Sequence, residues 1–246
     1  MTWKHGDVVS GNGWELRCGN FLDMVPGSET FDVLLADPPY SERTHAGHNK
    51  GVKIASSGTL DSAKRRDLSY GSFSLEDVRA FVDFWEPKIF GWMGIMSDDS
   101  LIIPWRTALE ETGRLGFSAL PCVMPGMTVR MAGDGPSSWC VHLNVARPRG
   151  EPYSKWGTLR GAYRYSSDRG HIGGKPLEMM RSIVRDYSKR DDLIVDPCCG
   201  WGTTILAALH EGRNAIGCEI DPATFGKAVD RIRQELQRGV TPPLRF

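Results

Sequence analysis

Four consecutive residues, Asp37-Pro38-Pro39-Tyr40, place a carboxylate, a rigid backbone and an aromatic ring directly after an apolar run. The run, residues 30–36, predicts a buried strand, and the prolines end it because they lack the N–H that a strand ladder requires. Asp37 and the Pro38 carbonyl are then hydrogen-bond acceptors held in fixed directions, and Tyr40 offers a flat face for stacking. Taken alone, the tetrapeptide is equally well interpreted as a turn that ends a strand.

A second segment, residues 193–222, reads as a strand ending in Asp196, a glycine turn, a helix and a strand ending in Glu219. Gly200 and Gly202 allow a tight turn and a close approach of backbone to ligand. A carboxylate about 20 residues past such a turn is placed to bind ribose hydroxyls. A nicotinamide dinucleotide site would show these features too, but its third glycine is replaced here by Ile205.

Three motifs together resemble the S-adenosylmethionine-dependent amino-methyltransferases of DNA: DPPY, DPCCGWGTT (residues 196–204) and HIGGKPLEMMRSIV (residues 171–184). The catalytic motif comes first and the cofactor motif about 160 residues later, as in the circularly permuted β class of that family. The resemblance implies a Rossmann-like α/β fold, with a mostly parallel twisted sheet flanked by helices. Members of this class are often homodimers and take part in restriction–modification.

The resemblance implies S-adenosylmethionine as the cofactor. Glu219 would bind its ribose, Ile220 its adenine ring, and His171 and Lys175 would close its methionine side. The sequence departs from the family pattern at Asn20, Cys198 and Trp201, where relatives carry Asp, Phe and Ser. The full set of expected cofactor-binding residues is Asn20, Phe21, His171, Lys175, Asp196, Pro197, Gly200, Gly202, Thr203, Thr204, Glu219 and Ile220.

The catalytic residues implied are Asp37, Pro38, Pro39 and Tyr40. The carboxylate and the Pro38 carbonyl would accept hydrogen bonds from an exocyclic amine, and Tyr40 would stack on a base rotated out of the duplex. Relatives with DPPY mostly modify adenine N6, so N6-adenine methylation of DNA is predicted, with N4-cytosine methylation as the alternative. More distant alternatives are methylation of an RNA base or a protein glutamine, or a catalytically silent nucleic-acid-binding module.

Two poorly periodic stretches carry an excess of positive charge, +3 over residues 41–70 and +4 over residues 147–170, although the whole chain is neutral. Basic loops on an acidic body can bind a phosphate backbone. Two loops, residues 41–72 and 147–170, are therefore predicted to recognise DNA within a single methyltransferase domain, residues 1–246. The candidate DNA-binding residues are Arg43, Lys50, Lys53, Lys64, Arg65, Arg66, Arg147, Arg149, Lys155, Arg160 and Arg164.

Composition excludes several classes of protein. Forty per cent apolar and 24% charged residues predict a globular domain, and neither a secretory signal nor an apolar run of 18 residues occurs, so a cytoplasmic enzyme without membrane contact is expected. The cysteines and histidines form no zinc pattern, and no metal is predicted. Pro121-Cys122 and Pro197-Cys198 are the candidates for a cytosine C5 nucleophile, but Pro197-Cys198 lies inside the cofactor motif.

Strands and helices are expected to alternate, as in a parallel α/β sheet that binds ligands at the carboxyl ends of its strands. Strands are predicted at residues 14–18, 30–36, 92–96, 117–124, 139–146, 193–195 and 215–218. Helices are predicted at residues 75–90, 101–111, 176–187, 203–211 and 223–237.

Overall fold

The computed structural model describes residues 2–49, 53–54, 60–61, 71–125, 138–150, 157–166 and 174–239, with the backbone alone for 46–49, 53–54 and 60–61. Its main sheet has the strand order β1-β2-β12-β11-β3-β6-β9-β8-β10, and β7 pairs with β9. The main-sheet strands are β1 (Val8–Gly11), β2 (Trp14–Cys18), β3 (Val33–Ala36), β6 (Met93–Ser97), β7 (Leu115–Gly116), β8 (Leu120–Val123), β9 (Cys140–Arg147), β10 (Tyr163–Arg164), β11 (Leu193–Asp196) and β12 (Asn214–Glu219). A separate hairpin joins β4 (Lys53–Ile54) and β5 (Leu60–Asp61).

The central strands β2, β12, β11, β3 and β6 run parallel, whereas β9 runs antiparallel to both β6 and β8. All residues of β3 and β6 are buried, which is what a parallel sheet covered on both faces requires. The predicted mostly parallel α/β sheet is therefore confirmed.

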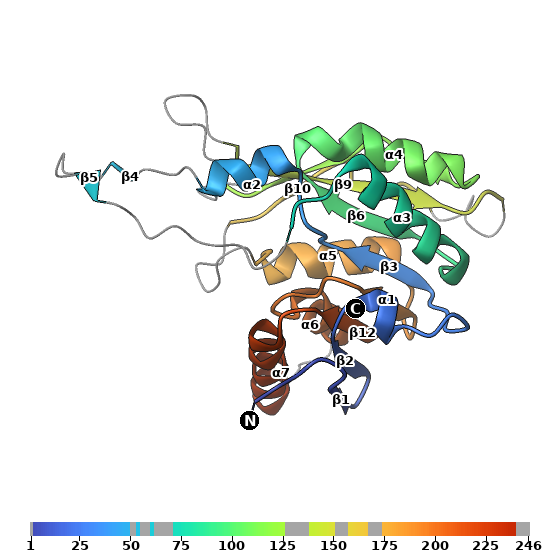
Figure 1. Ribbon diagram of the computed structural model, residues 1–246. Helices are drawn as coiled ribbons and strands as arrows, with labels where there is room; N and C mark the ends of the chain where they lie inside the picture. The colour runs from blue at the N-terminus through green and yellow to red at the C-terminus, as the bar shows by residue number, and fades with distance from the viewer. Residues whose placement is uncertain are drawn as a thin grey trace.

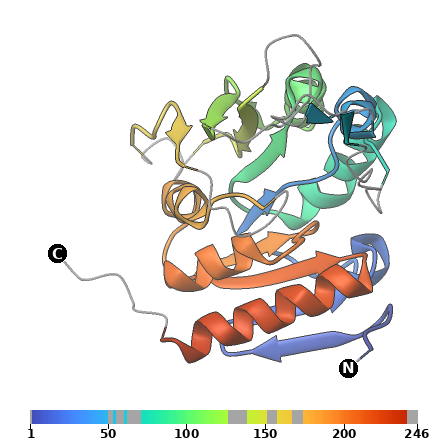
Figure 2. The same cartoon turned by 90° about the vertical axis from the view of Figure 1, so that its left-hand side faces the viewer.

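Helices cover both faces of this sheet (Figure 1 and Figure 2). The apolar sides of α5, α6 and α7 pack into one buried cluster, and those of α3 and α4 into another, which Phe21 and Met24 of α1 also join. The helices are α1 (Phe21–Met24), α2 (Glu42–Asn49), α3 (Leu75–Trp85), α4 (Ile102–Glu111), α5 (Leu177–Tyr187), α6 (Thr203–His210) and α7 (Pro222–Gln237). None of the helices within the described ranges is long and apolar enough to cross a membrane.

Several element boundaries differ from the sequence prediction, most clearly at one helix end and one strand. The helix predicted over residues 75–90 begins with a capping box between Ser74 and Asp77 but ends at Trp85, and a 3-10 turn, Glu86–Lys88, follows. Pro87 explains this end, because proline cannot donate the hydrogen bond that would continue the helix. Of the strand predicted over residues 117–124, only Leu120–Val123 forms a strand, β8, and the short strand β7, Leu115–Gly116, lies before the predicted range.

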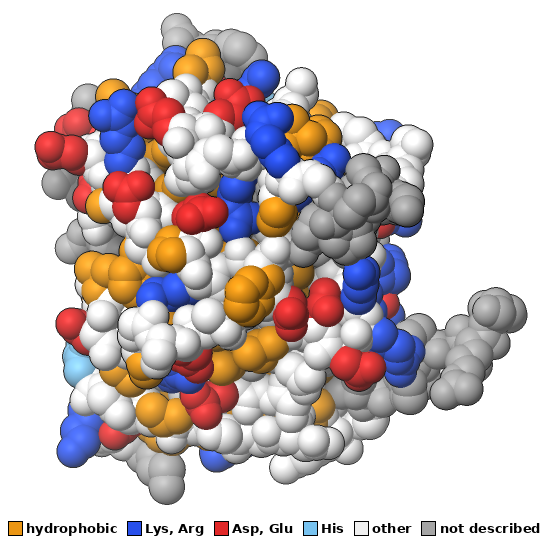
Figure 3. Space-filling model, turned by 90° about the vertical axis from the view of Figure 1, so that its right-hand side faces the viewer, with side chains coloured by type: hydrophobic (Ala, Val, Ile, Leu, Met, Phe, Trp, Pro, Cys, Tyr) orange, Lys and Arg blue, Asp and Glu red, His pale blue; other side chains and the backbone are white. Residues whose placement is uncertain are grey.

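After β11 the chain continues to β12, on one side of β11 in the sheet. After β3 it continues to β6, on the opposite side, so the order of strands reverses between β11 and β3. A crevice at the carboxyl ends of two such strands is where open α/β sheets bind ligands. In Figure 1 this edge is marked by α2, which follows β3. The opposite edge, shown in Figure 3, intersperses acidic, basic and hydrophobic side chains.

Candidate active site

The turn after β11 is tight because two of its glycines adopt left-handed conformations, with φ of 51° at Gly200 and 73° at Gly202. Gly202 caps α6, and a Cβ atom there would lie 3.0 Å from Cδ1 of Ile232. A Cβ at Gly200 would meet no atom within 4 Å, so that side of the turn faces open space. The turn can therefore bring its backbone close to a ligand.

Glu219 ends β12 and ties this turn in place. Its Oε2 accepts a hydrogen bond from the Gly200 N–H at 3.0 Å, and its Oε1 accepts one from the Asp221 N–H at 2.8 Å. Burial raises the pKa of Glu219, and the backbone N–H groups act in the opposite direction. Ile220 follows with 47% of its surface exposed, which leaves its side chain available to pack against a ring.

Asp196 ends β11 and is only 2% exposed. Its Oδ1 accepts a hydrogen bond from the Cys198 N–H at 3.1 Å, and Thr204 also donates to the carboxylate. Burial raises the pKa of Asp196 to about 7, against the lowering effect of these hydrogen bonds. Pro197 follows directly in the same turn.

Thr203 begins α6 and its hydroxyl accepts a hydrogen bond from Arg231 of α7 at 2.8 Å. The same guanidinium donates to the Trp201 carbonyl at 3.1 Å, and Lys227 lies 5.1 Å from the centre of the Trp201 ring. Helix α7 therefore supports the turn from outside, and Trp201, one of the three departures from the family pattern, packs against it.

Asn20 and Phe21 follow β2, whose end pairs with the end of β12. The Asn20 side chain caps α1 by accepting a hydrogen bond from the Leu22 N–H at 3.1 Å. The Phe21 ring packs among three aromatic rings, those of Phe81, Phe84 and Trp85, at centroid distances of 5.4–5.5 Å. These contacts give both residues a structural role, and their contact with a cofactor stays a prediction.

Asp37, at the end of β3, is the centre of a small polar group. Its Oδ1 accepts a hydrogen bond from the Tyr40 hydroxyl at 2.8 Å, and its Oδ2 pairs with the ammonium of Lys175. The Lys175 Nζ atom also lies 5.4 Å from the centre of the Tyr40 ring. Lys175, which was expected on the methionine side of a cofactor, thus lies against the Asp37 carboxylate. Pro38 and Pro39 lie between Asp37 and Tyr40 in the tetrapeptide.

The two motifs meet at the carboxyl ends of β3 and β11, because Asp37 lies near enough to Asp196 to raise the pKa of that carboxyl by charge repulsion. Sequence reasoning missed the residues that secure the far side of the tetrapeptide. Asp98, at the end of β6, binds Ser41 and Thr44 through its carboxylate. The available signal was an aspartate two residues after the strand predicted over residues 92–96, a position comparable to those of Asp37 and Asp196 at the ends of their strands.

The candidate DNA-binding arginines are divided between the two edges of the sheet. Arg43 lies three residues after Tyr40, and its Nη1 atom is 4.0 Å from Oδ2 of Asp99. Arg164 is the last residue of β10 and pairs with Val123, near the edge of the sheet where the parallel strands have their carboxyl ends. Arg147 ends β9 at the opposite edge, where its guanidinium lies over the rings of Trp92 and Phe117 at 5.9 and 5.7 Å.

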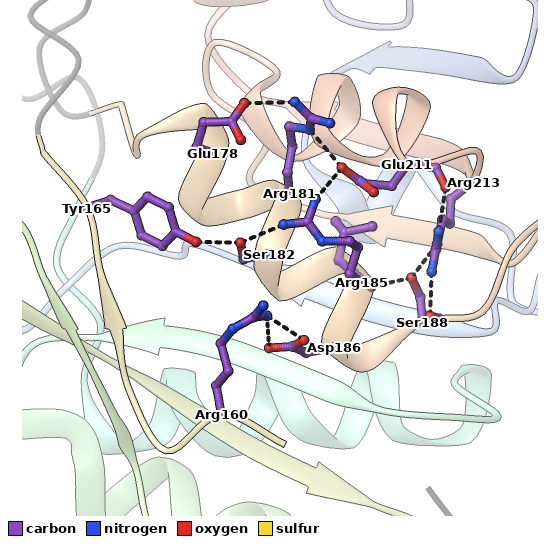
Figure 4. Close-up of polar contacts among 11 residues, drawn as sticks. Arg160, Tyr165, Glu178, Arg181, Ser182, Arg185, Asp186, Ser188, Glu211 and Arg213 are labelled. Carbon is purple, nitrogen blue, oxygen red and sulfur yellow. Dashed lines mark hydrogen bonds and ion pairs between the residues drawn. The ribbon is translucent and has the colours of Figure 1, made fainter. Parts of the chain in front are cut away.

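Two further arginines have partners away from the crevice. Arg149 donates to the Gly113 carbonyl at 3.0 Å, and the Nη1 atom of Arg160 donates to both carboxylate oxygens of Asp186, at 2.6 and 2.8 Å (Figure 4). The remaining predicted site residues, Lys50, Lys64, Arg65, Arg66, Lys155 and His171, lie outside the described residues, and for Lys53 the backbone alone is described.

The cysteines are free thiols. Burial raises the pKa of Cys122 to about 12, so this thiol is a poor source of the thiolate that a C5 nucleophile would need. Within the described residues, no three His, Cys, Asp or Glu side chains are grouped so that they could hold a metal ion.

The chain resembles known proteins in sequence. The profile of the N6/N4 methyltransferases, described as DNA methylase, matches residues 61–229. YubD of Escherichia coli (strain K12), a protein named as a methylase, is 33% identical over 204 residues, or 82% of each chain. The Type II methyltransferase M.HindIII of Haemophilus influenzae is 32% identical over 87 residues, which cover 31% of this chain and 28% of that protein.

Solved structures share the fold. The M1.HpyAVI complex with S-adenosylmethionine superposes with a TM-score of 0.61 at 19% identity, covering 89% of this chain and 99% of that chain. The cytosine-N4-specific PvuII DNA methyltransferase superposes with a TM-score of 0.60 at 12% identity, covering 93% of each. Since the family profile spans more than half of the sequence and the fold agrees, the chain belongs to the N6/N4 family of DNA amino-methyltransferases.

Proposed function

We propose that this protein transfers a methyl group from S-adenosylmethionine to the exocyclic N6 of an adenine in DNA. The observation that carries the proposal is the carboxylate of Asp37, which lies at the carboxyl end of β3, next to β11. There it adjoins the glycine turn, and Tyr40 and Lys175 hold it from two sides.

The residues around the glycine turn fit S-adenosylmethionine. Gly200 faces open space, and Ile220 has an exposed apolar side chain beside the carboxylate of Glu219. Glu219 would bind the ribose hydroxyls and Asp196 would lie toward the methionine part, a cationic group that a carboxylate attracts. The cofactor supplies, when bound, an electrophilic methyl group on a sulfonium.

Asp37 and the Pro38 carbonyl would accept hydrogen bonds from the amine. The lone pair of an adenine amine is delocalised into the ring, and two acceptors on its hydrogens favour the tetrahedral nitrogen that can attack a methyl group. Each carboxylate oxygen has two acceptor positions, so Asp37 keeps a position for the amine while Tyr40 and Lys175 are bound. The same oxygens are placed to take the proton that the methylated amine releases.

Tyr40 would position the base. An amine inside a duplex is inaccessible to this crevice, so the target base must be rotated out or presented in a single strand. The Tyr40 ring lies beside Asp37, held by its hydroxyl, and would stack on such a base while Asp37 binds the amine.

The loops of residues 41–72 and 147–170 would bind DNA around this pocket as parts of one domain. Of the described arginines, Arg43 and Arg164 lie toward the carboxyl edge and are proposed to bind phosphates. The contacts of Arg147, Arg149 and Arg160 give those three a structural role instead.

The test is to incubate the protein with isotopically labelled S-adenosylmethionine and mixed-sequence DNA, digest the DNA to nucleosides and identify the labelled nucleoside by mass spectrometry. Labelled N6-methyladenine is the expected product. Labelled N4-methylcytosine would refute adenine as the target while keeping the pocket. No label in DNA, with label appearing in RNA or protein supplied in parallel incubations, would refute DNA as the substrate.

A further inference from the structure

Asp98 is a buried carboxylate at the end of β6, the strand next to β3, with only 3% of its surface exposed. Its Oδ2 accepts a hydrogen bond from the Ser41 N–H at 3.1 Å and further ones from the hydroxyls of Ser41 and Thr44. Its Oδ1 accepts one from the Leu101 N–H at 3.2 Å, which caps the turn leading into α4. One side chain therefore joins β6, the start of α4 and the residue that follows Tyr40.

Tyr40 is held from its other side as well. The Phe73 N–H donates to the Tyr40 carbonyl at 3.0 Å, and the backbone of Ser41 accepts from Thr44 and His45 as α2 begins. Both ends of the loop of residues 41–72 are thus fastened at the tetrapeptide. Asp98 holds the first end, and Tyr40 itself holds the second.

A chain of buried polar groups supports Asp98 from behind. The Ser97 hydroxyl donates to the Asp98 carbonyl at 2.9 Å, and the Asn144 side chain donates to the Ser97 hydroxyl at 2.9 Å and to the Ile95 carbonyl at 3.0 Å. Asn144 lies on β9 and is 2% exposed. A buried polar network of this kind fixes one arrangement of the elements it joins.

We infer that Asp98 is a positioning residue for methyl transfer, which holds Ser41 and thereby fixes the Tyr40 ring and its hydrogen bond to Asp37. The inference rests on the proposed function and adds a residue outside the tetrapeptide and the cofactor turn. Small displacements of reacting groups cost a large factor in rate, so a residue that sets the place of Tyr40 controls turnover rather than cofactor affinity.

An amide at this position cannot replace the carboxylate. Both Asp98 oxygens accept from a backbone N–H, that of Ser41 on Oδ2 and that of Leu101 on Oδ1. Asparagine has one acceptor oxygen and one NH₂ group, so either orientation leaves one of these N–H groups facing a donor. The Asp98→Asn variant keeps the size of the side chain and loosens this junction.

The experiment compares Asp98→Asn with Asp32→Asn. Asp32 is a matched control because its Oδ2 accepts a hydrogen bond from the Leu193 N–H at 2.7 Å at the opposite edge of the sheet. We expect kcat on DNA to fall by about tenfold or more in Asp98→Asn, with the Kd for S-adenosylmethionine changed less than twofold. We expect kcat of Asp32→Asn to stay within about twofold of the wild type.

Hydrogen exchange gives a second readout that does not depend on turnover. Backbone amides of residues 40–45 should exchange faster in Asp98→Asn than in the wild type, and at wild-type rates in Asp32→Asn. If the wild type methylates no nucleic acid, the proposed function fails and the exchange pattern still decides whether Asp98 holds this segment. Unchanged exchange and kcat in Asp98→Asn, or an equal loss of kcat in both variants, would overturn the inference.

Discussion

Three aspartates end neighbouring parallel strands, and their surroundings give them different roles. Asp37 keeps 27% of its side chain exposed and is bound by Tyr40 and Lys175, as a group that meets substrate requires. Asp196 and Asp98 are buried, and their hydrogen bonds go largely to the backbone and to hydroxyls of adjoining turns. One residue type would thus supply an acceptor for the proposed reaction and two supports for the adjoining loops.

The raised pKa of Asp196, about 7, predicts how stability depends on pH. The unfolded carboxyl titrates near pH 3.9, so between about pH 4 and pH 7 the folded state binds the proton more strongly than the unfolded state. The contribution of protonated Asp196 to the free energy of unfolding is complete below pH 4 and is lost as the pH rises through about 7. In Asp196→Asn, the free energy of unfolding should therefore fall less steeply with pH over this window.

Denaturant titrations of both proteins from pH 4.5 to pH 7.5 measure this difference. Glu219 and Asp192, whose pKa values burial also raises, remain in the variant and leave it a residual slope. Parallel curves for wild type and variant would contradict the assignment of this slope to Asp196.

At the scale of elements, a cluster of charges joins α5 to the turn after α6 (Figure 4). Glu211 is 2% exposed and its Oε1 accepts hydrogen bonds from Arg181 at 2.7 Å and Arg185 at 2.6 Å. These helices flank the glycine turn, since α5 precedes β11 and α6 follows it. The cluster therefore helps to hold the helix that begins at the cofactor motif.

Removing this carboxylate should be costly. Glu211→Ala leaves two arginines without their buried partner, and we expect the free energy of unfolding to drop by about 3 kcal/mol, the low end for a buried pair because both arginines are partly exposed. The control is Glu178→Ala, which breaks an exposed pair of Arg181 and should change stability by less than about 0.5 kcal/mol. Equal losses in the two variants would contradict the role given to burial.

The elements show how far the sequence predicts the structure. Long helices such as α3 and α5, and apolar strands, were predicted because the residues they bury are apolar and recur at a regular spacing along the chain. The short helices α1 and α2 and the strands β1 and β7 were missed, since two to eight residues give too little periodicity.

The site was predicted unevenly for a related reason. Asp37, Asp196 and Glu219 were predicted as site residues because each stands at the end of a strand within a motif. The pairing of Lys175 with Asp37 joins residues 138 positions apart, and the bonds of Asp98 to Ser41 join residues 57 apart. Such contacts depend on which strands are neighbours, and strand order is set by the packing of the whole sheet.

At the scale of the molecule, the described basic side chains are not all on the same edge as the crevice. Arg43 and Arg164 lie toward the carboxyl edge, whereas Arg147 lies at the amino edge and Arg149 binds the Gly113 carbonyl. If DNA approaches the edge that carries Asp37, only the first two should contribute to binding.

This predicts a difference in salt dependence. In Arg43→Ala and Arg164→Ala, DNA affinity should weaken. In a plot of the logarithm of the binding constant against the logarithm of salt concentration, the steepness of the slope should fall by about 0.9 for each lost phosphate contact. Arg149→Ala should bind like the wild type. Fluorescence anisotropy with a labelled duplex at several salt concentrations measures all three, and a loss confined to Arg149→Ala would place the DNA on the other edge.

The central claim, that Asp37 binds the amine that receives the methyl group, is tested most directly by single-turnover methyl transfer in Asp37→Asn. The asparagine keeps the shape of the side chain but has one acceptor oxygen instead of two, and it weakens the pairing with Lys175. We expect the transfer rate to fall by about a hundredfold or more while the Kd for S-adenosylmethionine changes less than threefold. Transfer within a few-fold of the wild-type rate, to the same nucleoside, would contradict it.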